Sequence, residues 1–115
     1  MPQVNEFVSG VLEVLAPLGD VRTRSMFGGY GIFLDGSMFA LITRDNRLFL
    51  KADDINRPQF EQLDLEPFGN MPYYAPPLDS QKGWPQMEPW ARGAVAASER
   101  AKSSKGSRAN RKNTR

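Results

Sequence analysis

Residues 21–51 read as short extended segments joined by tight turns, and this pattern constrains the fold more than any other feature of the chain. Side chains alternate over 21–26, and further strands are predicted over 32–34, 37–43 and 47–51. Asp35-Gly36 is the strongest hairpin signal, because a type I′ turn needs positive φ at both central residues. Four short strands in immediate succession form an antiparallel meander.

Helical periodicity precedes and follows this meander. Over 4–16, apolar side chains recur at spacings of three and four, which predicts a first helix with Asn5 as its N-cap. Asp53 or Asp54 would cap a second helix that ends near Leu63. Each helix would pack an apolar stripe against the sheet.

The remaining part of the chain adds two short strands and one helix. Residues 68–69 and 71–75 look extended and are interrupted by prolines. A last helix is predicted from Glu88 or Pro89 to about Arg100, with Pro89 at the first helical position. We therefore expect an α+β fold in which a four-strand antiparallel meander plus two short strands packs against about three helices as a two-layer sandwich.

Charge divides the sequence into a body, residues 1–101, and a basic tail, residues 102–115. The body carries nine Lys and Arg against thirteen Asp and Glu, which leaves about −4. The tail has no acid and no large apolar residue, so we expect it to be disordered. Its basic residues, candidates for nucleic-acid contact, are Lys102, Lys105, Arg108, Arg111, Lys112 and Arg115.

The chain contains neither cysteine nor histidine among its 115 residues. This composition excludes a disulfide framework, a thiolate nucleophile, a Ser-His-Asp triad and an imidazole metal ligand. We therefore expect a protein that is not an enzyme and that uses no cofactor and no metal. No apolar stretch approaches the roughly 20 residues of a membrane span, and no secretory signal is evident, so a cytoplasmic location is expected.

Several motifs occur in an order that resembles one known family. Residues 24–33 read Arg-Ser-Met-Phe-Gly-Gly-Tyr-Gly-Ile-Phe, and residues 48–53 read Leu-Phe-Leu-Lys-Ala-Asp. Together with Pro-Tyr-Tyr at 72–74 and Pro-Trp-Ala-Arg at 89–92, they resemble the TfoX N-terminal domain family over roughly residues 4–101. The resemblance implies a bacterial regulator of competence for DNA transformation. Full-length regulators of that kind continue into a C-terminal domain that has no counterpart in this sequence.

The glycine-rich run at 28–31 has two interpretations. Glycines let backbone N–H groups approach an anion, as in phosphate-binding loops. The run precedes a strand and not a helix, however, and no Lys-Ser or Lys-Thr follows it. The alternative is that glycine provides positive φ or a bulge in a tight strand connection, and the sequence favours this alternative.

Candidate binding residues lie next to that run and further along the chain. Arg22 and Arg24 project from one strand face beside Tyr30 and would contact an anion or an acidic partner, or else form surface salt bridges. Of Tyr73 and Tyr74, one is expected in the core and the other exposed, with Tyr74 the candidate for stacking. Aromatic residues expected in the core are Phe39, Phe49 and Trp90.

The acidic residues between 53 and 66 are better explained by helix capping and a solvated face than by a metal site. Lys51 beside Asp53 gives only a weak case for acid–base catalysis. The leading hypothesis is thus a non-enzymatic regulatory or interaction module with a protein partner, as a monomer or weak dimer without membrane contact. Sequence-independent nucleic-acid binding through the tail is the second hypothesis, and an uncharacterised enzyme is the third.

Overall fold

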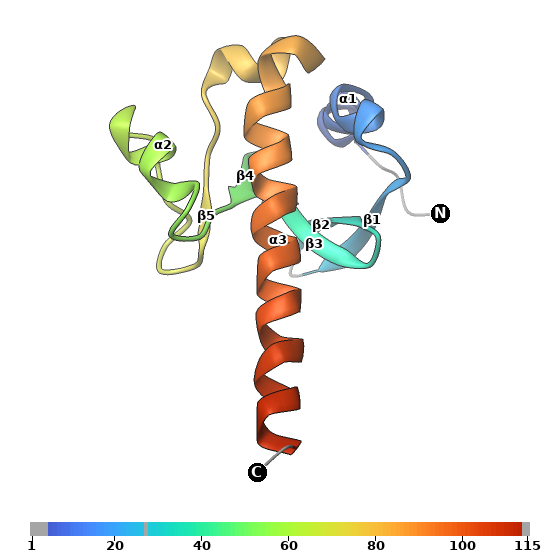
Figure 1. Ribbon diagram of the computed structural model, residues 1–115. Helices are drawn as coiled ribbons and strands as arrows, with labels where there is room; N and C mark the ends of the chain where they lie inside the picture. Colours follow the sequence, from blue (N-terminus) through green and yellow to red (C-terminus); the bar gives the residue numbers. More distant parts are fainter. Residues whose placement is uncertain (1–4, 27, 114–115) are drawn as a thin grey trace.

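The computed structural model describes residues 5–26 and 28–113, with side chains described through Ser103. One antiparallel sheet contains five strands in the order β1-β2-β3-β4-β5, so strands that follow each other in sequence are neighbours. Figure 1 shows α3 running across this sheet, with α1 and α2 on either side of it. The predicted α+β fold is confirmed. The strands are β1 (Val21–Met26), β2 (Gly29–Leu34), β3 (Ser37–Ile42), β4 (Leu48–Lys51) and β5 (Tyr73–Tyr74).

The turns of the meander follow the sequence signals. Asp35 and Gly36 have φ of 53° and 80°, as a type I′ turn between β2 and β3 requires. Two details differ from the expectation. β2 already begins at Gly29, so most of the glycine-rich run lies within the strand. Residues 68–69 form no strand, because the chain there has a single isolated bridge, between Pro67 and Tyr74, and turns back at Met71.

Three α-helices and two 3₁₀ turns complete the fold. The Asn5 side chain accepts a hydrogen bond from the Val8 N–H at 2.9 Å, so the predicted cap is confirmed. The second helix begins later than predicted, because Asp53 accepts bonds from the N–H groups of Ile55 and Asn56 in a preceding turn. The elements are α1 (Glu6–Leu15), η1 (Ala16–Leu18), α2 (Arg57–Gln62), η2 (Leu78–Lys82) and α3 (Trp84–Asn113).

The start of α3 corrects the sequence prediction. The helix begins at Trp84, and Pro89 therefore lies inside it and not at its first position. A proline at this point removes one backbone hydrogen bond, since its nitrogen has no hydrogen. The turn before it is held by packing: Met87 is buried in the core, and its N–H donates to the Gly83 carbonyl at 3.0 Å. Tertiary contacts thus outweigh the local preference of proline.

The end of α3 also differs from the expectation. Residues 102–113 continue the helix where the composition predicted disorder, and they extend beyond the rest of the fold (Figure 1). Helical hydrogen bonds are local, so a helix nucleated by packed residues can continue without burying a further apolar face. No helix in the described part of the chain has the length and apolar character needed to cross a bilayer.

The core lies between one face of the sheet and the helices. Small side chains on α3 let this helix approach β3 and β4 closely, since Ala91 and Ala94 are both fully buried there. From α1, the buried residues Val8, Val11 and Leu15 pack on the same core. Among the described residues, the helices therefore cover one face of the sheet, and the connection between α2 and β5 lies against the opposite face, where Phe68 packs on Phe49.

Candidate functional site

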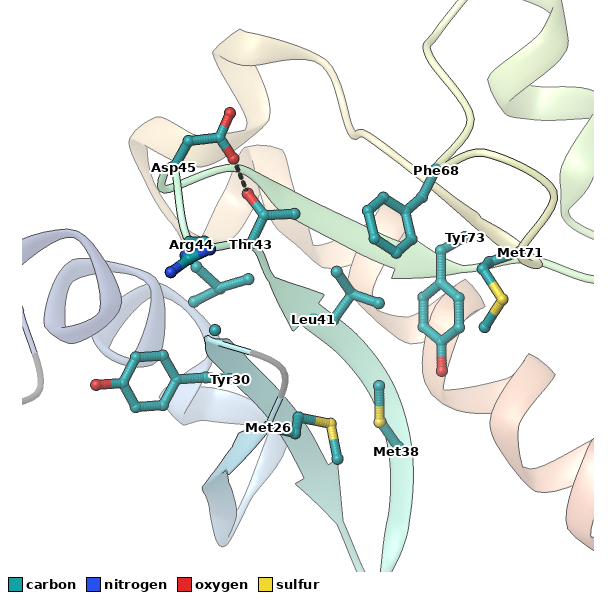
Figure 2. Close-up of a pocket in the computed structure, with 12 residues that line it drawn as sticks. Met26, Tyr30, Met38, Leu41, Thr43, Arg44, Asp45, Phe68, Met71 and Tyr73 are labelled. Atoms are coloured by element: carbon teal, nitrogen blue, oxygen red, sulfur yellow. Dashed lines mark hydrogen bonds between the residues drawn. The ribbon is translucent and has the colours of Figure 1, made fainter.

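The uncovered face of the sheet carries an apolar depression of about 620 Å³. In Figure 2, Leu41 lies at its centre, Met26 lies on one side, and the residues from the α2–β5 connection and β5 lie on the other. Gly29, Tyr30, Ile42 and the residues of the β3–β4 turn also line it. We call this depression the apolar trough and define it by Met26, Met38, Leu41, Phe68, Met71 and Tyr73.

An irregularity in β3 gives this face its composition. The register passes from Ile32↔Ala40 to Phe33↔Met38, so Phe39 is left without a partner across the ladder. Phe39 and Ala40 both belong to the buried core, whereas Met38 lines the trough. Simple alternation would have placed Phe39 on the same face as Leu41. The extra residue therefore places the Phe39 ring in the core and leaves the Met38 side chain on the open face of the sheet.

Glycines in β2 let neighbouring backbone and side-chain atoms approach this strand closely beside the trough. A Cβ atom at Gly29 would lie 2.0 Å from the Ile42 carbonyl oxygen, so only glycine fits there. A Cβ atom at Gly31 would lie 2.9 Å from the Met26 sulfur and 3.1 Å from the Met38 sulfur. These distances give Gly29 and Gly31 a steric role that the sequence did not predict, whereas Gly28 has the positive φ, 81°, that the structural interpretation expected.

Aromatic rings form the opposite wall of the trough. Phe68 packs on Phe49 with ring centroids 4.9 Å apart, and this contact covers Phe49, which is buried. The Tyr73 side chain is 5% exposed, and its burial raises the pKa of the phenol. The Lys51 Nζ atom lies 5.2 Å from the centroid of the Tyr73 ring. The wall thus consists of packed aromatic rings, and a cation lies against it.

The β3–β4 turn supplies the polar end of the trough. The Thr43 hydroxyl donates to the Asp45 carboxylate at 2.5 Å, and this bond lowers the pKa of Asp45. Thr43 also accepts a bond from the backbone N–H of Arg47 at 3.1 Å, which closes the turn. Arg44 lines the trough with an exposed side chain. This end therefore presents one carboxylate that is already hydrogen-bonded and one guanidinium.

The register separates the predicted binding residues Arg22, Arg24 and Tyr30. Arg24 pairs with Gly31, and Ser25 pairs with Tyr30, so the two arginines and the tyrosine lie on opposite faces of the sheet. The Tyr30 ring packs against the core and points away from the trough (Figure 2). Arg22 forms an exposed ion pair with Asp20 at 3.0 Å, and the Arg24 guanidinium lies 6.0 Å from the Phe33 ring centroid.

Neither tyrosine of the Tyr73-Tyr74 pair is fully exposed, which corrects the expectation that one ring would be free. Tyr74 faces the helices and stacks on Phe60 with centroids 5.2 Å apart. Its hydroxyl donates to the Glu61 carboxylate at 3.4 Å. Phe60 in turn contacts Trp90, whose ring is partly buried. The candidate Tyr74 thus belongs to the packing between β5, α2 and α3.

The acidic residues near α2 are engaged with arginines. Asp53 accepts two hydrogen bonds from the Arg100 guanidinium, at 2.7 and 2.8 Å, and these lower the pKa of Asp53 to about 2. Asp54 and Glu61 both pair with Arg57. Within the described residues, no group of three or more carboxylates is arranged to hold a metal ion. Lys102 has an exposed side chain, and the remaining basic residues of the tail lie beyond the side chains that the structure describes.

Comparison with known proteins identifies the family. The model of the TfoX N-terminal domain matches residues 13–98, which is most of the chain. The chain belongs to the TfoX N-terminal domain family. This domain is also similar to the DNA transformation protein TfoX1 of Aliivibrio fischeri, with 43% identity over 51 residues. That match covers 44% of this chain and 24% of the relative, so the aligned stretch spans about a quarter of that protein's length.

Sequence reasoning missed the trough as a site. Its residues are three methionines, a leucine and two aromatics spread over 26–73, and none of them carries a motif for chemistry. One local signal was present: methionines at positions 26, 38 and 71 fall in or beside strands, where β-branched residues are more usual. The face that they share became visible only once the register was known.

Proposed function

We propose that this member of the TfoX N-terminal domain family is a non-enzymatic interaction module that acts in the regulation of DNA transformation by binding a protein partner. The observation that carries the proposal is the apolar trough on the uncovered face of the sheet. A largely apolar depression with a few polar groups at one end is typical of binding sites. The name of the A. fischeri relative, a DNA transformation protein, supports the cellular role.

The proposed absence of catalysis rests on the available side chains. The chain has no cysteine or histidine, and the carboxylates of Asp53, Asp54, Glu61 and Glu66 are paired with arginines. Two described hydroxyls donate to carboxylates, but the Thr43–Asp45 contact lies in the β3–β4 turn, where Thr43 also accepts the Arg47 N–H, and the Tyr74–Glu61 contact lies in the packing between β5 and α2. Turnover of a small substrate by the purified chain would overturn this part of the proposal.

Two exposed apolar residues provide a matched test. Met71 borders the trough and is 53% exposed, while Leu63 lies outside the trough and is 56% exposed. In a strain of the source organism lacking its own copy, Met71→Glu should lower transformation frequency at least tenfold. Leu63→Glu should leave the frequency unchanged. Equal frequencies for both variants, with both proteins folded by circular dichroism, would contradict the proposal.

A second candidate function is weak, sequence-independent nucleic-acid binding by residues 102–115. The continuation of α3 to Asn113 favours it, because the helix carries this acid-free segment away from the acidic body. Six neutralised phosphates would give a log–log salt slope near −5.

The test compares duplex binding by the full chain and by a chain that ends at Arg100, across a range of salt concentrations. The shortened chain should remain folded, since Arg100 still pairs with Asp53. It should also lose all binding. Retained binding would assign the contact to the body and contradict this second function.

A further inference from the structure

The basic residues that lack an ion pair gather around the apolar trough. Among the ten Lys and Arg side chains in the described ranges 5–26 and 28–103, six pair with a carboxylate. Of the other four, only Lys102 lies away from the open face. Arg24 shares the strand face of Met26, Arg44 lines the trough, and Lys51 lies over the Tyr73 ring. The body is acidic overall, yet its unpaired cations border one apolar surface.

The spacing of these cations matches the width of a helix. Arg24 lies on β1 and Lys51 on β4, so three strand spacings, about 14 Å, separate them across the sheet, and Lys51 is offset by two residues along the strands. A helix with side chains is about 10–12 Å across, so one lying on the trough would place its two flanks near these two residues. Arg44 lies at the end of the trough formed by the β3–β4 turn. A small ligand would meet the apolar floor and at most one of the three cations.

Charge also distinguishes among the molecules that could bind this face of the sheet. A second copy stacked on the same face would bring its own Arg24, Arg44 and Lys51 toward these cations, which is unfavourable. The basic residues 102–115 of the chain have the same sign. The one carboxylate lining the trough, Asp45, already accepts the Thr43 hydroxyl. An acidic partner therefore fits the rim best.

We propose that the trough binds an amphipathic helix of a partner protein, with an apolar stripe flanked on both sides by Asp or Glu. This inference rests on the proposed interaction function and specifies the chemistry of its partner. The stripe packs on Met26, Met38 and Leu41, since methionines adapt their shape to different apolar side chains. The acidic flanks pair with Arg24 and Lys51, and these pairs select the partner more than they strengthen binding.

The test titrates the full ¹⁵N-labelled chain with three synthetic 18-residue peptides. One has a Leu stripe with Glu flanks, the second has the same stripe with Lys flanks, and the third has the acidic composition in scrambled order. The expected result is amide shifts at Met38, Leu41 and Tyr73 with the Glu-flanked peptide, bound at least tenfold more tightly than the other two.

Each alternative result has a defined meaning. Equal binding of the Glu- and Lys-flanked peptides at the trough would overturn the acidic partner while leaving the interaction function in place. Tighter binding of dodecanoate, with displacement of the peptide, would overturn the proposed helical partner in favour of a small amphiphile. Amide shifts that grow with protein concentration in the absence of peptide would overturn the proposed partner helix in favour of self-association. Failure of all peptides would also overturn it, and the Met71→Glu transformation assay would then decide the proposed function separately.

Charge reversal provides a control within the chain. Arg24→Glu and Arg44→Glu alter exposed side chains that hold no ion pair, so the fold should be unaffected. Each should weaken binding of the Glu-flanked peptide at least fivefold. Lys102→Glu changes the net charge equally at a cation away from the trough and should have no such effect. Equal weakening by all three variants would mean a response to net charge and would overturn the assignment.

Discussion

Glycines at three positions show how one residue type has opposite effects on stability. Gly10 lies in the middle of α1 with an exposed position, and a Cβ atom there would have no atom within 4 Å. Gly29, in contrast, lies against the backbone of β3, where any side chain would collide with the Ile42 carbonyl. Gly31 lies between two methionine sulfurs. The sequence distinguishes a helical glycine from a strand glycine but does not reveal these neighbours.

Substituting Gly10 and Gly29 by alanine should therefore change stability in opposite directions. Gly10→Ala should raise the free energy of unfolding by about 1 kcal/mol, because alanine favours a helix and loses less entropy on folding. Gly29→Ala should lower it by roughly 2–3 kcal/mol through overpacking. Urea denaturation followed by circular dichroism measures both values. Destabilisation by Gly10→Ala would mean that α1 is not helical at this position.

The elements are joined by a few specific side-chain contacts, and the ion pair between Asp53 and Arg100 has the least exposed side chains among the ion pairs of the described residues. Arg100 reaches from α3 to the segment between β4 and α2, and both side chains are about one-third exposed. In the same segment, the buried Asn56 donates to the Lys51 carbonyl and accepts from the Asp53 N–H. This network ties α3 to the end of β4.

Asp53→Asn should remove a pH-dependent part of the stability. The folded pKa of Asp53 is about 2, below its ordinary value of 3.8, chiefly because of the Arg100 guanidinium. A depressed pKa stabilises the fold above pH ~4, and that stability is lost as the pH falls through about 2. Allowing for partial exposure, the variant should lose about 1 kcal/mol at pH 7. The difference from the native chain should shrink toward pH 2.

The matched control for this measurement is Asp79→Asn. Asp79 pairs with Lys82 at 3.4 Å, but both side chains are largely exposed, so this substitution should leave the free energy of unfolding nearly unchanged at every pH. Thermal or urea unfolding between pH 2 and pH 7 provides the comparison. A constant loss for Asp53→Asn over this range would show that its contribution does not depend on charge.

Across the whole molecule, α3 divides into a packed part and a part without described tertiary packing. Ala91, Ala94, Ala97 and Ser98 are buried against the sheet and its neighbouring helices, whereas Ala101 and the two residues after it are exposed. Beyond them the helix extends past the body (Figure 1). The two parts share one helical geometry but differ in what stabilises it.

Hydrogen exchange should separate these two parts of α3. Amides from Ala91 to Ser98 should exchange only through global unfolding, because their side chains are in the core. Amides from 104 to 113 should exchange at least a hundredfold faster, since local opening of a helix end needs no global unfolding. Equal protection along the helix, measured by NMR at neutral pH, would mean that the C-terminal part packs against another surface.

The sequence by itself determined the element types, their order and the hairpin turns. Element types depend on the periodicity of apolar residues over short windows of sequence. The hairpin turns depend on residues such as Asp35-Gly36, whose backbone preferences act within a few positions. It also determined the family, through motifs that remain contiguous in the chain. The start of α3 escaped sequence reasoning because the packing of Met87 outweighs the local preference of Pro89.

Only the tertiary structure decided which residues share a surface. The register of β1 and β2 separated Arg24 from Tyr30, and the irregularity at Phe39 turned Met38 outward beside Leu41. A shift of one residue exchanges the two faces of a strand, and pairing between distant segments sets that shift. The candidate surface is therefore a product of long-range pairing, while the fold that carries it follows from local preferences.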